Sequence, residues 1–198
     1  GVDVVVEGGQ TMNPSTEDIL NAVEHLNAET IYILPNNKNI ILAAEQAAKI
    51  VEDKKVVVIP TKTIPQGITA MISLSEDRST EENLENATEE ISNVKSAQIT
   101  YAVRNTTIDD VEIHENDVMA LGDSGIIGVD KSIDSAVDKA LANMIDDSSE
   151  LVCLYYGEEV SEEDATKLCD ELVGKYENVE FELHFGGQPV YYYFISVE

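Results

Sequence analysis

Hydrophobic and polar residues follow two periodicities along the first third of the chain. Short apolar runs have the length of buried strands, and between them apolar residues recur every three or four positions, as in amphipathic helices. Pro65 is placed to open a third helix, because proline is tolerated in the first helical turn. Strands that alternate with helices in this way predict parallel βαβ units. The predicted strands cover 4–6, 30–34 and 55–59, and the predicted helices cover 15–26 and 40–51.

The pattern changes after a helix predicted over 79–95, which opens with a capping box formed by Ser79 and Glu82. Beyond it strands outnumber helices, which predicts a mixed or antiparallel sheet with helices packed on it. We therefore expect an α/β protein with a parallel α/β lobe over 1–78, a connecting helix over 79–95 and a mixed-sheet α+β lobe over 96–198. The strands of the second lobe are expected at 97–103, 111–113, 118–121, 126–129, 151–156, 179–185 and 190–197, and its helices after Ser132 and Ser161.

The charge of the chain narrows the classes of partner. Its net charge is −27, from 39 acidic and 12 basic residues. Nucleic acid is therefore a poor partner and an anionic membrane would repel this surface. No apolar stretch approaches the roughly 20 residues needed to span a bilayer, so we expect no membrane insertion. The acidity lies mainly beyond residue 75, where it serves either solvation or attraction of a basic partner.

The cysteines indicate a cellular location, and the first residue indicates whether the chain is part of a longer protein. Cys153 and Cys169 have neither redox nor zinc-site spacing, and both fall on apolar faces, so we expect small buried thiols in a reducing, cytoplasmic location. The chain does not begin with Met and starts inside a predicted strand. We therefore expect a piece of a longer protein.

Polar residues gather in three loops of the first lobe. In an open parallel sheet, ligands bind beyond the carboxyl ends of the strands, where these loops meet. One interpretation is a crevice for a carboxylate or phosphate, and the other is that the same residues only cap helices and close turns. The candidate binding residues are Gly9, Gln10, Thr11, Asn13, Ser15, Asn36, Asn37, Lys38, Thr61, Lys62 and Thr63. His184 joins them as a candidate because a glycine-rich turn follows it directly.

Catalytic and metal-binding patterns are incomplete. The segment 122–125 (GDSG) is similar to a serine-protease nucleophile segment, but the histidines lack the required context, and a hairpin turn explains it better. The segment 114–117 (HEND) is not a zinc-binding HExxH motif, and the chain has no phosphate-binding GxxxxGK[ST] loop. The sequence therefore predicts neither catalytic residues nor metal ligands in this chain, and a hydrolase using Ser124 is the least favoured hypothesis.

Five segments in a fixed order resemble the bacterial dihydroxyacetone-kinase-like proteins that form the ATP-binding subunit of fatty acid kinase. The resemblance is to the C-terminal domain of that family and spans nearly the whole chain. The segments are 8–16 (GGQTMNPST), 34–39 (LPNNKN), 59–67 (IPTKTIPQG), 121–125 (LGDSG) and 186–191 (GGQPVY).

This resemblance implies a DegV-like fold and a division of labour between domains. In the family, ATP and Mg²⁺ bind an N-terminal domain and a middle domain completes the active site, so no cofactor and no kinase activity are expected of this chain alone. The resemblance also implies that the C-terminal domain helps to dock the separate fatty-acid-binding subunit. The related lipid binders have a Thr-Ser-Gln-Pro-Ser stretch that contacts the fatty acid carboxylate, a second ligand loop with Ser-Gly-Thr, and a His-x-Gly-Pro-Gly turn. The resemblance implies that 8–15, 36–39 and 184–186 are the corresponding stretches here.

Two functions remain open on this basis. The leading hypothesis is a non-catalytic docking domain that binds the fatty-acid-carrying subunit, whose acyl carboxylate is then phosphorylated by other domains. The alternative is a small-ligand module that binds a fatty acid or another anion in the crevice formed by the first-lobe loops.

Overall fold

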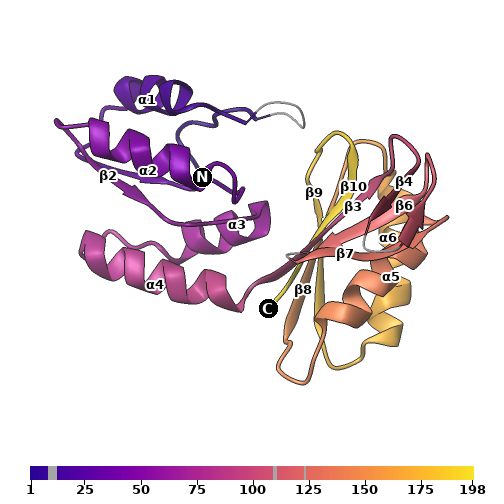
Figure 1. The fold of residues 1–198 in the computed structure, drawn as a ribbon. Coiled ribbons are helices and arrows are strands. Elements are labelled where there is room, and N and C mark those ends of the chain that lie inside the picture. The colour runs from indigo at the N-terminus through magenta and orange to yellow at the C-terminus, as the bar shows by residue number, and fades with distance from the viewer. Residues whose placement is uncertain (9–12, 109–110, 123) are drawn as a thin grey trace. The chain divides into compact units, whose positions relative to one another are not determined.

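The computed structural model describes residues 1–8, 13–108, 111–122 and 124–198. These residues form two units, Gly1–Asn93 and Val94–Glu198 (Figure 1). Within the described residues, no helix is long and apolar enough to cross a membrane.

The first unit is built around a two-stranded parallel sheet, and helices cover both faces of this sheet. Helices α1 and α2 cover one face, where Ile31 and Ile33 of β1 meet Ile19, Val23, Ala44 and Ala47. The side chains of Tyr32 and Leu34 alternate to the other face, where they pack with residues of α3 and α4. A parallel sheet needs cover on both sides, and this unit supplies it with two helices on each (Figure 1). The elements are α1 (Thr16–His25), β1 (Thr30–Ile33), α2 (Ile41–Ile50), β2 (Lys55–Val58), α3 (Ile64–Ser73) and α4 (Thr80–Asn93).

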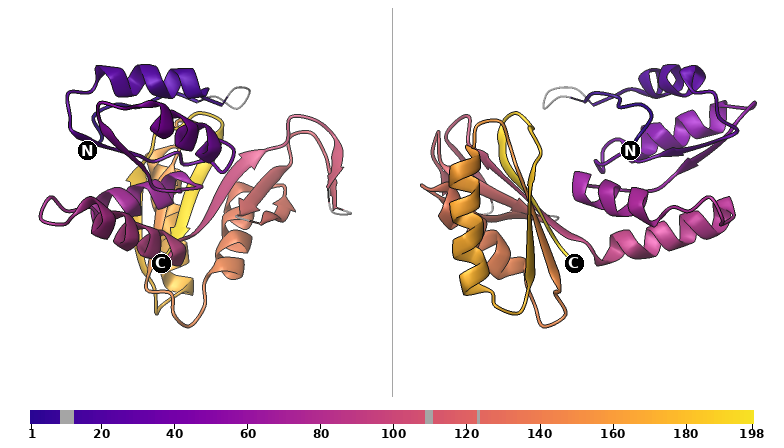
Figure 2. Two further views of the ribbon diagram at one scale, coloured as in Figure 1. Left: turned by 60° about the vertical axis from the view of Figure 1, so that its left-hand side comes forward. Right: turned by 180° about the vertical axis from the view of Figure 1, so that it is seen from behind.

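The second unit is a six-stranded mixed sheet with the strand order β7-β6-β3-β10-β8-β9. All neighbouring strands are antiparallel except β8 and β9, which are parallel and joined through α6. Helices α5 and α6 lie on the same face of this sheet (Figure 2). The elements are β3 (Lys95–Tyr101), β4 (Thr106–Ile108), β5 (Val111–Ile113), β6 (Val118–Gly122), β7 (Gly125–Asp130), α5 (Ile133–Met144), β8 (Leu151–Tyr156), α6 (Glu162–Lys175), β9 (Glu180–Phe185) and β10 (Tyr191–Val197).

The α/β class, the parallel first sheet and the mixed second sheet agree with the sequence pattern. Pro65 stands in the first turn of α3, and Ser79 and Glu82 form the expected reciprocal hydrogen bonds at the start of α4. The segment 122–125 joins β6 to β7, whose residues Gly122 and Gly125 are paired, as a hairpin requires. Ser124 therefore lies in a turn.

Two features differ from the sequence expectations. The strand predicted at 4–6 is not formed. Val5 is 73% exposed, and no strand among the described residues pairs with this segment, so its strand propensity has no packing partner. The helix expected to connect the lobes is α4, which packs on α3 and is counted with the first unit.

The core of the second unit predicts a position-dependent cost of truncation. Leu141 on α5 is fully buried, so Leu141→Ala should lower the free energy of unfolding by about 2–5 kcal/mol. The matched control is Leu42→Ala on α2, where the leucine is 64% exposed and the expected change is within about 0.5 kcal/mol. Denaturant unfolding followed by circular dichroism measures both, and equal effects would contradict the assigned core.

Candidate functional site

Two loops at the carboxyl ends of β1 and β2 are tied together by one pair of side chains. The backbone N–H of Asn36 donates to Thr61 Oγ1 over 3.0 Å, and the Thr61 hydroxyl donates to Asn36 Oδ1 over 2.9 Å. Thr61 is fully buried and Asn36 is half-buried, so both of these bonds are partly shielded from water. Asn36 has a φ of 54°, a left-handed conformation that asparagine tolerates better than most residues. The Asn36–Thr61 pair therefore fixes the shape of this edge.

Residues in the first turn of α3 hold the neighbouring backbone and leave space for the Asn36–Thr61 pair. Gln66 accepts from the backbone N–H of Lys62 over 2.8 Å and donates to the carbonyl of Ile91 on α4 over 3.3 Å. A β-carbon added at Gly67 would lie 2.1 Å from Asn36 Oδ1, so only glycine leaves room for the asparagine side chain. Neither Gln66 nor Gly67 was among the residues that the sequence singled out. The feature of the sequence that could have indicated them is the Pro-Gln-Gly run at the start of the predicted third helix.

The polar groups that the sequence predicted for this edge mostly serve the fold. Ser15 caps α1 and forms a capping box with Asp18, and Thr63 caps α3 by accepting from the backbone N–H of Gln66. The Asn37 side chain accepts from the backbone N–H of Asn39 over 2.9 Å, closing the turn before α2. These are the contacts of the cap-and-turn interpretation.

Two of the side chains exposed at this edge carry positive charge. Lys38 follows Asn36 in the β1–α2 loop, and Lys62 lies in the β2–α3 loop directly after Thr61; both are exposed. Because the Asn36–Thr61 pair joins the two loops, it also positions the segments that carry the two cations. Asn13 is exposed as well, whereas Gly9, Gln10 and Thr11 lie outside the described residues.

His184 belongs to the second unit, where it is exposed on β9. Its ring stacks on Tyr155 of β8 with ring centroids 5.3 Å apart, and its Nε2 lies 2.9 Å from Glu182 Oε2. The contacts of His184 are therefore with its own sheet, and the prediction that it contributes to the loop site stays a prediction.

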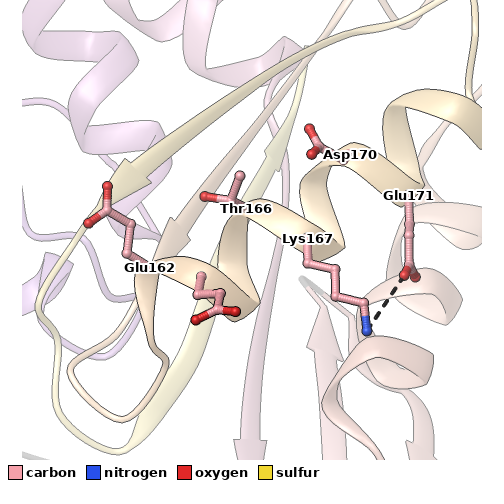
Figure 3. A pocket seen from close by; sticks show the side chains of 6 residues that line it. Glu162, Thr166, Lys167, Asp170 and Glu171 are labelled. Carbon is pink, nitrogen blue, oxygen red and sulfur yellow. Dashed lines mark ion pairs between the residues drawn. The ribbon is translucent and has the colours of Figure 1, made fainter.

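A shallow hollow on the outer face of α6 has a different character. Figure 3 shows its side chains projecting from one helix, with Lys167 facing Glu171 at 4.0 Å. Its carboxylates face solvent, and it holds no group suited to covalent chemistry. The residues lining it are Glu162, Glu163, Thr166, Lys167, Asp170 and Glu171.

The two units together define a fold class shared with fatty-acid-binding proteins. The Streptococcus pneumoniae Fatty Acid Kinase (Fak) B3 protein loaded with linoleic acid matches 93% of this chain and 76% of its own, with a TM-score of 0.65 and 14% identity. The DegV family protein Cg2579 from Corynebacterium glutamicum matches 93% of this chain and 82% of its own, with a TM-score of 0.64 and 14% identity. The dihydroxyacetone kinase of C. freundii matches 94% of this chain but 41% of its own, with a TM-score of 0.61 and 15% identity. The chain thus has the DegV-like fold.

Sequence comparison identifies the family. Residues 1–198 match the family of FakA-like C-terminal domains of fatty acid kinase, and the chain belongs to it. Protein YloV of Bacillus subtilis (strain 168) is 48% identical over 198 residues, and the uncharacterized protein SAR1202 of Staphylococcus aureus (strain MRSA252) is 43% identical over the same length. In both cases the whole chain is matched to 36% of the relative, so it spans about a third of the length of these curated relatives.

Substituting Gly67 tests the construction of the loop edge. Gly67→Ala should displace the Asn36 side chain and cost about 1–3 kcal/mol of stability, because Thr61 would lose its buried acceptor. In the matched control, Gly174→Ala on α6, the new β-carbon meets nothing within 4 Å and should be neutral or stabilising. Denaturant unfolding compares the two. If both substitutions are neutral, Asn36 is not held as described.

Proposed function

We propose that this chain is a docking domain that binds the fatty-acid-carrying subunit of a fatty acid kinase. In this proposal the chain holds its partner so that the acyl carboxylate meets ATP and Mg²⁺ bound by other parts of the longer protein. Proximity would then supply the rate enhancement, without a reacting group from this chain. Its family membership and its span of about a third of its relatives support a domain that works within a larger protein.

The internal hydrogen bonding of the loop edge carries the proposal. Asn36 and Thr61 satisfy each other, and Ser15, Asn37 and Thr63 bond to backbone groups of their own segments. Polar groups already paired in this way are poor ligands for a small anion, because binding would first break their bonds. Lys38 and Lys62 are left exposed on a shaped surface. Such a surface suits recognition of an acidic patch on a protein partner.

The packing of the second unit also favours docking over storage of a lipid. Its interior is filled by large side chains that are less than 2% exposed, among them Tyr193, Ile99, Leu141 and Leu154. An acyl chain would have to displace such side chains from a close-packed core.

The two cysteines are free, as a reducing compartment such as the cytoplasm would keep them.

Calorimetric titration of the fatty-acid-loaded partner subunit into this chain tests docking. We expect saturable binding that the charge reversals Lys38→Glu and Lys62→Glu together weaken by about tenfold, most strongly at low salt. The control is Lys49→Glu at the far end of α2, an exposed site where the reversal changes the charge by the same step as Lys38→Glu or Lys62→Glu alone. Absence of binding by the folded chain rejects the proposal, and equal losses for Lys49 and for the loop lysines reject this edge as the docking surface.

The alternative function is binding of a fatty acid by the chain itself. It is favoured by the fold, since solved structures with this fold include proteins loaded with linoleic and heptadecanoic acid. Native mass spectrometry of the purified chain separates the two ideas. Docking predicts the bare mass and no thermal shift on adding fatty acid, whereas a retained acyl chain would favour the alternative.

A further inference from the structure

Four side chains from two parallel strands meet on one face of the second sheet. The register pairs Cys153 with Glu182 and Tyr155 with His184. Side chains two positions apart on a strand share a face, so all four project to the same side. The sequence contains this arrangement only as Cys-x-Tyr in one strand and Glu-x-His in another, and the parallel pairing of β8 with β9 brings the two halves together.

Three of these residues present a compact set of donor atoms. Glu182 Oε2 lies 2.9 Å from His184 Nε2 and 4.0 Å from Cys153 Sγ, and the ligand atoms of all three lie within 4.8 Å of one another. In a tetrahedral zinc site with bonds of about 2.0–2.3 Å, ligand atoms lie about 3.3–3.7 Å apart. Shifts of under about 1 Å by side chains would therefore bring the three atoms around one ion.

The geometry points to a binding site for a zinc-like divalent cation, with Cys153, Glu182 and His184 as its three protein ligands. Thiolate, imidazole and carboxylate donors together suit a borderline-soft ion such as Zn²⁺ and not Mg²⁺ or Ca²⁺, which prefer oxygen alone. As the sulfur–metal bond forms, the Cys153 thiol releases its proton to solvent. The thiolate and the carboxylate then balance the charge of the ion, and its fourth position stays open to water or an exogenous ligand.

The surroundings suit this role in two ways. Tyr155 stacks on the His184 ring with 24° between the planes, which restrains the ring while its Nε2 faces Glu182. Glu182 and His184 are exposed while Cys153 is 6% exposed, so an ion would arrive from solvent and reach the thiol last. The net charge of −27 would raise the local concentration of cations around this surface.

A cysteine nucleophile is the competing interpretation of the same three residues. Burial above all, with the negative charges of Glu182 and Glu198, holds the pKa of Cys153 above its usual value. The thiol is therefore protonated at neutral pH, whereas a nucleophilic cysteine needs a lowered pKa. A metal ion overcomes this because it binds the thiolate and displaces the proton.

Cobalt titration of the chelator-stripped, reduced chain tests the site. Co²⁺ substitutes for zinc and gives a thiolate charge-transfer band that binding to surface carboxylates cannot produce. We expect one Co²⁺ per chain with this band, displaced by Zn²⁺ and not by excess Mg²⁺. Cys153→Ser should abolish the band, and Glu182→Gln and His184→Gln should each weaken binding by about tenfold or more.

Matched controls keep the result decisive. Cys169→Ser removes the other free cysteine, and His114→Gln removes another exposed histidine; neither should change the band. Glu182 and His184 are exposed, so their variants should keep the fold, which circular dichroism verifies. Absence of a charge-transfer band at millimolar Co²⁺, or a band that survives in Cys153→Ser, overturns the site.

Discussion

The shape of the loop edge in the first unit depends on the mutual hydrogen bonding of Asn36 and Thr61. Each loop follows one strand of a two-stranded parallel sheet, and without a link each would be free to move with its own helix. The buried Thr61 hydroxyl bridges them, and Gly67 leaves the space in which Asn36 accepts its bond. Several polar groups are used inside the edge, and the cations Lys38 and Lys62 are among the side chains that it exposes. This pairing is the basis of the proposal that the edge recognises a protein surface.

The same fold serves different purposes among the relatives, and the distinction lies in side chains. Solved structures with about 14% identity share the arrangement of strands and helices, and some of them hold fatty acids. At this identity the likeness concerns the backbone, and the function has to be argued from the residues at the site. Here Ser15 and Thr63 cap helices, Asn37 closes a turn, and Asn36 and Thr61 bond to each other. The family assignment and the local geometry therefore support the same proposal from independent directions.

The sequence predicted those parts of the fold in which local pattern and burial agree. Helices with capping residues, such as those opened by Ser79, Ser132 and Ser161, were visible because cap chemistry is local. The run 4–6 has strand propensity, but a strand also needs a neighbouring strand to pair with. The sequence of the segment does not identify such a partner. The assignment of α4 to the first unit depends on its packing against α3, a contact that hydrophobic spacing alone does not identify.

The site was predictable to a similar extent. Parallel β-α order indicated which loops would meet, so Asn36 and Thr61 could be named together, but their direct bond and the roles of Gln66 and Gly67 required coordinates. Cys153 and Glu182 lie 29 residues apart, and only the register of β8 with β9 makes them neighbours. No single segment contains that information.

Competition within the complete kinase reaction tests the central claim most directly. The measured quantity is acyl phosphate formation by the longer protein at a limiting concentration of its fatty-acid-loaded partner. Excess isolated chain should inhibit the reaction by occupying the partner, extra loaded partner should restore it, and the isolated chain should form no product by itself. Product formation by the chain alone, or an undiminished rate at saturating excess, would contradict the account.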